Sequence, residues 1–321
     1  MVAASSALAS AYRDFASAAQ GRSKLYEMLA NGVADDTEIL ARIASLPPPK
    51  RQPNLFFAAM KYLFGAAEAW PEFRARAFAH WEEVSAVMMA RRVQTNEPAR
   101  CATLLPLLAR LSQPLALLEV GASAGLCLLP DYYAYDYGGH AVAPSILTAR
   151  PPLFHCVASA GTPLPAHNVK IAWRAGLDLN PLDCRDPDDV RWLKALVWPG
   201  EGEREEMLSR ALAIAAAAPP RLVAGDLRNG LATLAVEAPR DATLVIFHSA
   251  VLNYIADPAE RAAFADWVGK TGAQWISQED PDIFSEANRR SWPAGSFFRL
   301  SLNGRTVARA ESHGASLEWL A

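Results

Sequence analysis

The sequence lacks the features that would suit it to a membrane or to nucleic acid. Its longest apolar runs, such as LAIAAAA and ATLVIF, are far shorter than the roughly 20 residues that a membrane-spanning helix needs. The formal net charge is only −3 and there is no long run of Lys and Arg, so the chain has no strongly basic surface. We therefore expect neither a nucleic-acid partner nor a membrane.

Paired cysteine motifs are also absent. The four cysteines lie far apart and never as C-x-x-C, a spacing that matches neither a zinc knuckle nor a dithiol redox motif. His140, His155 and His167 beside these cysteines match no metal-ligand spacing either, so we expect no metal centre. We expect reduced thiols in a cytoplasmic protein. The cysteines are Cys101, Cys127, Cys156 and Cys184.

The N-terminus has no basic stretch followed by an apolar core, and it carries Arg13 and Asp14 where a signal peptide would be apolar. Leu8, Tyr12 and Phe15 recur instead at helical spacing. Further helical stretches with aromatic residues on one face continue toward residue 112. We predict an N-terminal helical region over residues 1–112, which covers the site and selects its substrate.

From Pro114 onward, short apolar runs alternate with helical or loop stretches. Near-continuous apolar runs are typical of strands that helices cover on both faces. Near the end, FFRLSLNGRTVARAES alternates apolar and polar residues around Asn303-Gly304, a strong hairpin signal. Residues 113–321 therefore predict an α/β domain, with a mostly parallel doubly wound sheet closed by a C-terminal antiparallel hairpin. The predicted buried strands are LALLEV, VKIAW, RLVAGD, ATLVIFHSA and AQWISQED.

A loop nearly free of side chains follows the first predicted strand, in LALLEVGASAGLCLL. Glycine permits positive φ and lets a ligand approach the backbone, and we expect a following helix to direct its free N–H groups at the same place. Three interpretations stay open: a cofactor loop, a tight turn needed for packing, and the nucleophile elbow of a hydrolase with Ser123 as nucleophile. The hydrolase would take its acid from Asp226 or Asp241 and its histidine from His248 or His313.

This segment resembles the first motif of the class I S-adenosylmethionine-dependent methyltransferases, (D/E)-x-G-x-G-x-G, with Ser123 in place of the middle glycine. In that superfamily acidic residues at the ends of later strands hold the ribose and the adenine. WRAGLDLNPLD offers Asp178, RLVAGDLRNGL offers Asp226, and LVIFHSAVLNYI resembles the fourth-strand motif. The resemblance implies S-adenosylmethionine as cofactor and a methyl acceptor that it does not identify.

RRVQTNEPARCATLLPLL, LLEVGASAGLCLLPDYYAYDYG and VWPGE resemble, more specifically, an uncharacterised bacterial family related to class I methyltransferases. The resemblance covers most of the chain. The stretch between Gly125 and Asp178 is longer than that superfamily usually has. We expect its inserted part, residues 130–168, to form a substrate-facing excursion or extra strands. Its tyrosines are expected in packing, with a substrate-lining role as the alternative: Tyr132, Tyr133, Tyr135 and Tyr137.

The resemblance implies one set of cofactor-binding residues and one candidate catalytic residue. The catalytic candidate is His248, because the near-neutral pKa of an imidazole suits a general base. A purely structural histidine is the alternative, and a binding module without catalysis is the alternative for the whole protein. In the stretch Gln94–Arg100, Asn96 or Glu97 could instead cap a helix with Pro98 in its first turn. The candidate cofactor-binding residues are Glu119, Gly121, Ala122, Ser123, Gly125, Asp178, Asp226, Leu227 and Ser249 from the resemblance, together with Gln94 and Arg100 from this dense polar stretch beside apolar helices. Valine at position 125 is expected to block the cofactor at a modest cost in folding.

Overall fold

The computed structural model describes residues 2–94, 96–283 and 297–321, and the chain divides into two compact units. One unit comprises Met1–Thr95 and Asp186–Glu206, and the other comprises Asn96–Arg185 and Met207–Ala321. This division differs from the expected boundary at residues 112/113. Helix α7 (Arg100–Leu108) belongs to the second unit, and helix α8 (Pro187–Ala195), far along the chain, belongs to the first.

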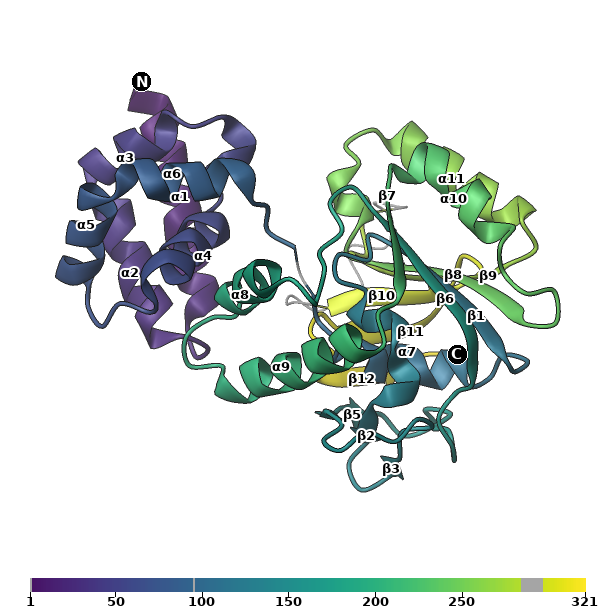
Figure 1. Cartoon of the computed structure of the whole chain (residues 1–321). Helices are drawn as coiled ribbons and strands as arrows, with labels where there is room; N and C mark the ends of the chain where they lie inside the picture. Colours follow the sequence, from purple (N-terminus) through teal and green to yellow (C-terminus); the bar gives the residue numbers. More distant parts are fainter. Residues whose placement is uncertain (1, 95, 284–296) are drawn as a thin grey trace. The chain divides into compact units, whose positions relative to one another are not determined.

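The first unit is entirely helical among its described residues (Figure 1), as the apolar periodicity predicts. Side chains that accept backbone N–H groups start three of its helices, because the first turn has no carbonyl partners of its own. Ser23 accepts from Tyr26, Asp36 accepts from Glu38 and Ile39, and Asp186 accepts from Asp188. The elements are α1 (Val2–Ala19), α2 (Lys24–Asp35), α3 (Thr37–Ala44), the 3₁₀ helix η1 (Pro48–Lys50), α4 (Pro53–Phe64), α5 (Trp70–Ala79), α6 (Trp81–Ala90), α8 and the start of α9 (Gly202–Ala217).

Aromatic side chains form the core of this unit. Tyr26 stacks on Phe57 with ring centroids 4.9 Å apart, and Tyr12 meets Phe57 edge to face at 5.9 Å. The hydroxyl groups of Tyr12 and Tyr26 are buried without a hydrogen-bond partner among the described residues.

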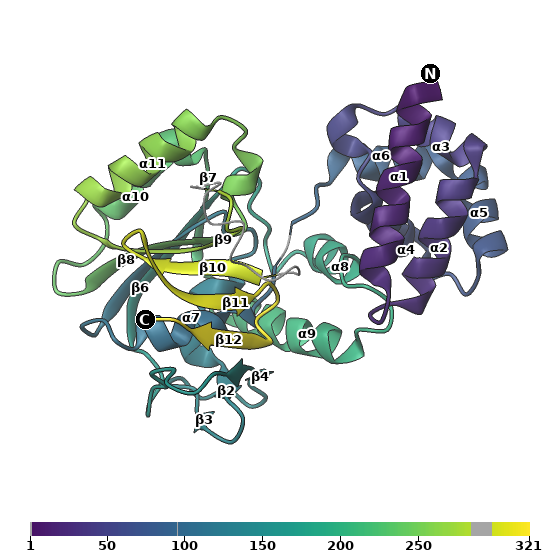
Figure 2. The same cartoon turned by 180° about the vertical axis from the view of Figure 1, so that it is seen from behind.

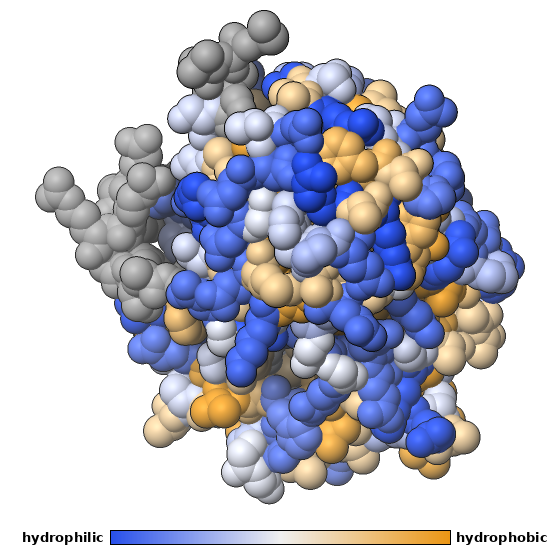
Figure 3. Space-filling view, turned by 90° about the vertical axis from the view of Figure 1, so that its left-hand side faces the viewer, coloured by the Kyte–Doolittle hydropathy of each residue, from blue (hydrophilic) through white to orange (hydrophobic). Residues whose placement is uncertain are grey.

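Hydrophilic residues cover most of the molecular face in Figure 3, interrupted by small hydrophobic groups. No described helix has the length and apolar character needed to cross a bilayer.

The second unit is built on a nine-stranded mixed sheet, which confirms the α/β class. Its order is β5-β12-β11-β10-β9-β8-β1-β6-β7, and the five strands from β9 to β7 are parallel. The expected hairpin is present as β10 and β11, with Asn303 and Gly304 both at positive φ in the turn. The strands are β1 (Leu115–Val120), β5 (Val157–Ala158), β6 (Ile171–Asp178), β7 (Arg221–Ala224), β8 (Thr243–Ser249), β9 (Gln274–Glu279), β10 (Phe297–Leu302), β11 (Arg305–Glu311) and β12 (Ser316–Trp319).

The inserted stretch between β1 and β6 forms extra strands, one of the two expected outcomes. Strands β2 (Ala134–Asp136), β3 (Ala141–Val142) and β4 (Leu153–His155) make a small separate sheet, whereas β5 extends the large sheet beside β12. Two short 3₁₀ helices, η2 (Leu126–Leu128) and η3 (Pro130–Tyr132), come before them. The connection from β1 to β6 therefore contains no α-helix.

Helices cover both faces of the parallel strands (Figures 1 and 2). Helices α10 (Leu227–Ala235) and α11 (Pro258–Lys270) pack on one face over Leu118, Val120 and Ile246, and α7 lies on the other. Residues that alternate along a strand point to opposite faces, and paired residues of neighbouring strands share a face. This alternation separates the polar residues near the strand ends into an α7-side group and an α11-side group.

Tyr12→Phe should stabilise the helical unit. Phenylalanine keeps the ring contacts and removes a buried hydroxyl without a partner, whose desolvation costs about 1–3 kcal/mol. The measurement is chemical denaturation of both proteins, followed in the helical unit. Tyr62→Phe is the control, because the Tyr62 hydroxyl donates to Asp188 and its removal should instead cost about 0.5–1.5 kcal/mol. Equal losses in both variants would show that the Tyr12 hydroxyl is satisfied.

Candidate functional site

The candidate residues gather where the parallel strands end. Parallel strands bring their carboxyl ends to one edge of the sheet, and in open α/β sheets that edge binds ligands. Glu119, Asp178 and Ser249 lie at the ends of β1, β6 and β8 respectively. Gln94 belongs to the helical unit, whereas every other candidate belongs to the sheet unit.

The glycines of the loop make room for protein side chains. Gly121 and Gly125 have φ of 72° and 71°, values that side chains adopt poorly. A Cβ at Gly121 would lie 2.3 Å from Val251 Cγ2, and a Cβ at Gly125 would lie 2.6 Å from Pro220 Cγ. The small residues are thus explained by close packing, so the expectation that valine at 125 costs little in folding is wrong.

The N–H groups of the loop are all used within the protein. A three-residue 3₁₀ helix, η2, follows the loop, so the expected α-helix directing free N–H groups at a ligand is absent from this described stretch. The loop therefore offers no cradle of free donors for a phosphate group. Gly121 and Ala122 donate to Leu177 O at 2.8 and 3.3 Å, Ser123 to Asp178 Oδ2 at 2.8 Å, Ala124 to Asn96 Oδ1 at 2.9 Å, and Gly125 to Ala122 O at 2.6 Å.

Asp178 ties the loop to the end of β6 and keeps capacity for a ligand. Its carboxylate accepts the N–H of Ser123 at 2.8 Å and that of Asn180 at 2.7 Å. A carboxylate has about four acceptor sites, so about two remain. The Asp178 side chain is only half-buried, which leaves these sites within reach of a hydroxyl-bearing ligand.

Ser123 lacks the environment of a hydrolase nucleophile. It has φ of 49°, but it is buried, and its hydroxyl accepts a hydrogen bond from the side-chain amide of Asn96. An elbow serine instead has an exposed Oγ at the start of a helix. Asn96 does not cap α7, because both of its amide atoms bond to the loop, whereas Glu97, the other expected cap, accepts the N–H of Ala99 just before α7 at 3.3 Å.

Both ring nitrogens of His248 are bonded inside the protein. Nδ1 lies 2.6 Å from Glu279 Oε1, and Nε2 accepts the indole N–H of Trp275 at 3.0 Å. The side chain has 0% exposure, and its ring packs against Phe264 of α11. A general base needs a free lone pair within reach of the substrate proton. The geometry favours the structural role of His248 over the catalytic one.

Asp226 and Leu227 have local structural roles. Asp226 accepts the N–H of Arg228 at 2.9 Å at the start of α10, and hydrogen bonding by the Arg228 guanidinium lowers the pKa of its carboxyl. Leu227 packs on the apolar cluster beneath α10 and α11. Arg228 thus already occupies acceptor sites of Asp226 that an adenine amino group would need.

On the α7 side of the sheet, three buried polar atoms have no hydrogen-bond partner among the described residues: Glu119 Oε2, Ser249 Oγ and Gln278 Nε2. They share a face because Glu119 pairs with Phe247, two residues before Ser249, and Ser249 pairs with Gln278. We call these three atoms the orphan row. Sequence reasoning missed Gln278, since an amide inside the strand AQWISQED gives no local signal.

Burial raises the pKa of the Glu119 carboxyl well above its usual range, more than the neighbouring Arg100 lowers it. Arg100 lies on α7, where its guanidinium donates to Ser312 O at 2.8 Å and to Ser249 O at 3.4 Å and lies over the Phe298 ring. Two of its five N–H donors are thus used by described residues. Arg100 supplies a positive charge beside the orphan row.

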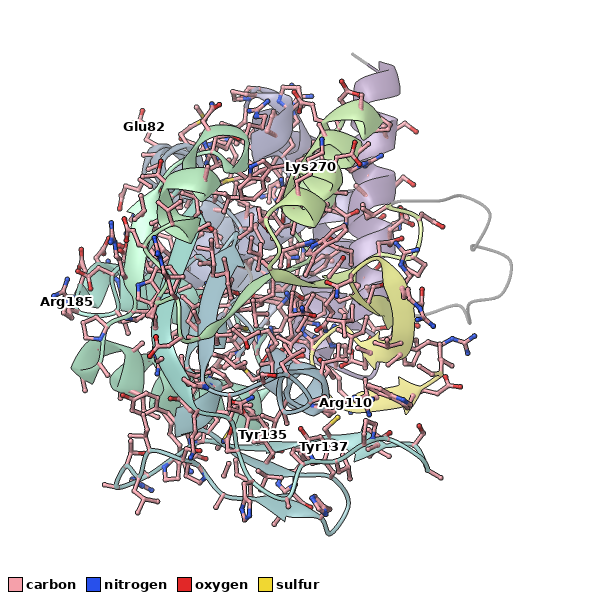
Figure 4. The ribbon with its side chains drawn as sticks, turned by 90° about the vertical axis from the view of Figure 1, so that its right-hand side faces the viewer. Glu82, Arg110, Tyr135, Tyr137, Arg185 and Lys270 are labelled. Carbon is pink, nitrogen blue, oxygen red and sulfur yellow. The ribbon has the colours of Figure 1, made fainter. Side chains whose placement is uncertain are left out.

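Three of the four tyrosines of the insertion, Tyr133, Tyr135 and Tyr137, are buried and pack in the core, whereas Tyr132 is half-buried. Tyr135 and Tyr137 lie next to each other (Figure 4), with ring centroids 6.4 Å apart. Their hydroxyls donate to Pro130 O at 2.8 Å and Ala102 O at 2.7 Å. The described residues contain no group of three or more His, Cys, Asp and Glu side chains arranged to hold a metal ion.

Residues 9–319 match a family of uncharacterised proteins conserved in bacteria (DUF2332), and the chain belongs to that family. No curated protein and no solved structure matches the chain. The family description names no reaction.

Gly125→Ala should destabilise the sheet unit more than Gly272→Ala does. The two glycines have φ of 71° and 74°, but a Cβ at Gly272 meets nothing within 4 Å. Positive φ alone costs about 1–2 kcal/mol, and the contact with Pro220 should add about 1–3 kcal/mol at Gly125. Chemical denaturation measures both losses. Equal losses would mean that the space beside Gly125 is open.

Glu119→Gln should flatten the pH dependence of stability. The pKa of Glu119 is raised in the folded protein. The contribution of its neutral carboxyl to folding stability is therefore fully present below the pKa of the unfolded state, and it is lost as pH rises toward the pKa of the folded state. The variant should therefore melt higher than wild type at about pH 9 and keep its stability better between about pH 5 and pH 9. Glu82→Gln, at an exposed position (Figure 4), removes the same charge and is the control. If the stability of Glu119→Gln falls with rising pH as steeply as that of wild type, the Glu119 carboxyl is not held neutral by burial.

Proposed function

We propose that the chain binds S-adenosylmethionine at the carboxyl edge of its parallel strands, as a class I methyltransferase-like protein with an unidentified acceptor. The observation that carries the proposal is the orphan row of Glu119, Ser249 and Gln278 beside Arg100. Buried polar atoms without partners are costly, so such a row at a ligand-binding edge favours a polar ligand group there.

The strand order supports this choice of ligand. Across the sheet, the five parallel strands lie in the order β7-β6-β1-β8-β9. Numbered by their order in the chain, these strands are the third, second, first, fourth and fifth, which is the order of doubly wound dinucleotide-binding sheets. The order reverses between β1 and β8, where such sheets open a crevice. Two features depart from the class I pattern: β1 connects to β6 without an α-helix, and the end of the sheet is a meander.

The chemistry of the row matches the amino acid end of the cofactor. The unused guanidinium donors of Arg100 and the amide of Gln278 would hold its carboxylate, since Arg binds carboxylates through paired hydrogen bonds. Glu119 and Ser249 would accept hydrogen bonds from its ammonium group. The remaining acceptor sites of Asp178 would take the ribose hydroxyls. Because the N–H groups of the loop are already bonded within the protein, they are not free to bind the diphosphates of NAD or ATP, and this favours S-adenosylmethionine.

S-adenosylmethionine supplies a methyl group on a sulfonium, which a nucleophile displaces. The chain's own contribution is to hold and align the ligand, and alignment accounts for much of the acceleration of such reactions. His248 has no free nitrogen for deprotonating an acceptor. This observation favours two outcomes: an acceptor that is nucleophilic without a base, or the second candidate function, a binding module without catalysis.

The test is a thermal-shift and calorimetric panel of S-adenosylmethionine, S-adenosylhomocysteine, NAD, ATP and CoA. Ligand at about 100 times its dissociation constant should stabilise the protein by roughly 2.7 kcal/mol. Ser249→Ala should weaken binding by about 0.5–1.5 kcal/mol without loss of fold, because its Oγ has no partner to lose.

Ser301→Ala is the matched control, since Ser301 Oγ is also buried without a partner but lies on β10, on the opposite face from Ser249. Its affinity should equal that of wild type. A shift with NAD alone, or equal affinity in Ser249→Ala and wild type, would overturn the assignment. Turnover of S-adenosylmethionine with extract fractions separates the methyltransferase from the binding module.

A further inference from the structure

A single carboxylate oxygen on the α11 side holds the segment that follows β8. Glu279 is fully buried at the end of β9, and its Oε1 accepts the N–H of Val251 at 2.9 Å and that of Leu252 at 3.2 Å. The same oxygen lies 2.6 Å from His248 Nδ1, and Trp275 fixes the other side of that ring. The carboxylate therefore connects β9, β8 and the chain leaving β8.

This segment depends on Glu279 because it has little regular structure of its own. Ala250 has φ of 57° and donates to Gln278 O at 3.0 Å, which turns the chain away from the sheet. Only the three-residue 3₁₀ helix η4 (Leu252–Tyr254) follows. N–H groups at the start of a helix have no partners within it, so the carboxylate satisfies donors that would otherwise be left without an acceptor.

Val251 connects this segment to the glycine loop by packing against Gly121. Its Cγ2 occupies the space that a Cβ at Gly121 would fill, 2.3 Å from that point. The loop in turn orients Asp178 through the N–H of Ser123. A displaced Val251 would leave Gly121 without its packing partner, at the turn that joins β1 to Asp178.

We infer that Glu279 is a positioning residue of the ligand site: it acts through Val251 on the loop Gly121–Gly125 and does not touch the ligand. Glu279 lies on the opposite face of the sheet from Ser249 and Gln278, so its effect has to pass through the chain that leaves β8. The inference rests on the proposed function for its ligand. Its structural step, the fixing of Val251 and Leu252, stands on the hydrogen bonds alone.

The test is a double-mutant cycle with S-adenosylhomocysteine as the probe, measured by calorimetry. Glu279→Gln removes the charge at similar size, and Val251→Ala removes the packing on Gly121 without touching the carboxylate. Each should weaken binding about tenfold, and the double variant should be hardly weaker than either single one, because coupled residues are not additive. An additive loss of about a hundredfold would overturn the route through Val251.

Trp275→Phe is the control for stability, because it removes the indole donor to His248 and leaves the bonds to Val251 and Leu252 in place. It should lower the melting temperature and keep wild-type affinity. If affinity falls in proportion to melting temperature in every variant, Trp275→Phe included, the residues have only a general structural role and the inference is overturned.

Hydrogen exchange of the ligand-free protein separates the two proposals. In Glu279→Gln the amides of Val251 and Leu252 should exchange faster, while that of Ala250, bonded to Gln278 O, should be unchanged. Unchanged exchange at Val251 and Leu252 would overturn the positioning role. If the wild-type protein binds no probe while Glu279→Gln shows the faster exchange at Val251 and Leu252, the proposed function alone is overturned.

Discussion

The sheet unit depends on one constraint: polar side chains buried at the ends of parallel strands need hydrogen-bond partners, because desolvation without them is costly. Strand alternation sends these side chains to opposite faces. On the α11 side, Glu279 and His248 are bonded to each other, to Trp275 and to the chain after β8. On the α7 side, Glu119, Ser249 and Gln278 keep unpartnered atoms. The first group is bonded through Glu279 Oε1, while Glu279 Oε2 has no partner among the described residues; the second group has one unpartnered atom on each of its three residues.

The glycine loop lies between these two groups and is fixed from several directions. Val251 and Pro220 fill the space above its glycines, and its N–H groups are used by Leu177, Asp178, Asn96 and the loop itself. Its role is to hold strand ends in register and to orient Asp178. In the proposed function, the ligand interacts with side chains beside the loop, because the N–H groups of the loop are already bonded within the protein.

The sequence by itself determined the main strands of the large sheet, but not the 3₁₀ helix η2 that follows the glycine loop in place of the expected α-helix. Period-2 and period-3.6 patterns, apolar run lengths and Asn303-Gly304 are local signals, so the strands from LALLEV to AQWISQED and the C-terminal hairpin agree with β1, β6, β7, β8, β9, β10 and β11. The α/β class and the cluster of acidic residues at strand ends follow from the same signals. Glycine spacing also located the loop, since positive φ restricts residue choice at each position.

Only the tertiary structure decided what these residues do. The packing of Val251 on Gly121, the bonds that occupy both nitrogens of His248, and the place of Gln278 in the orphan row join residues far apart in the chain. The same holds for the units, since the segment Asp186–Glu206 joins the helices of the first third. A sequence pattern reports which face a residue occupies. It does not report the partner across that face, because partners are set by strand order and helix packing.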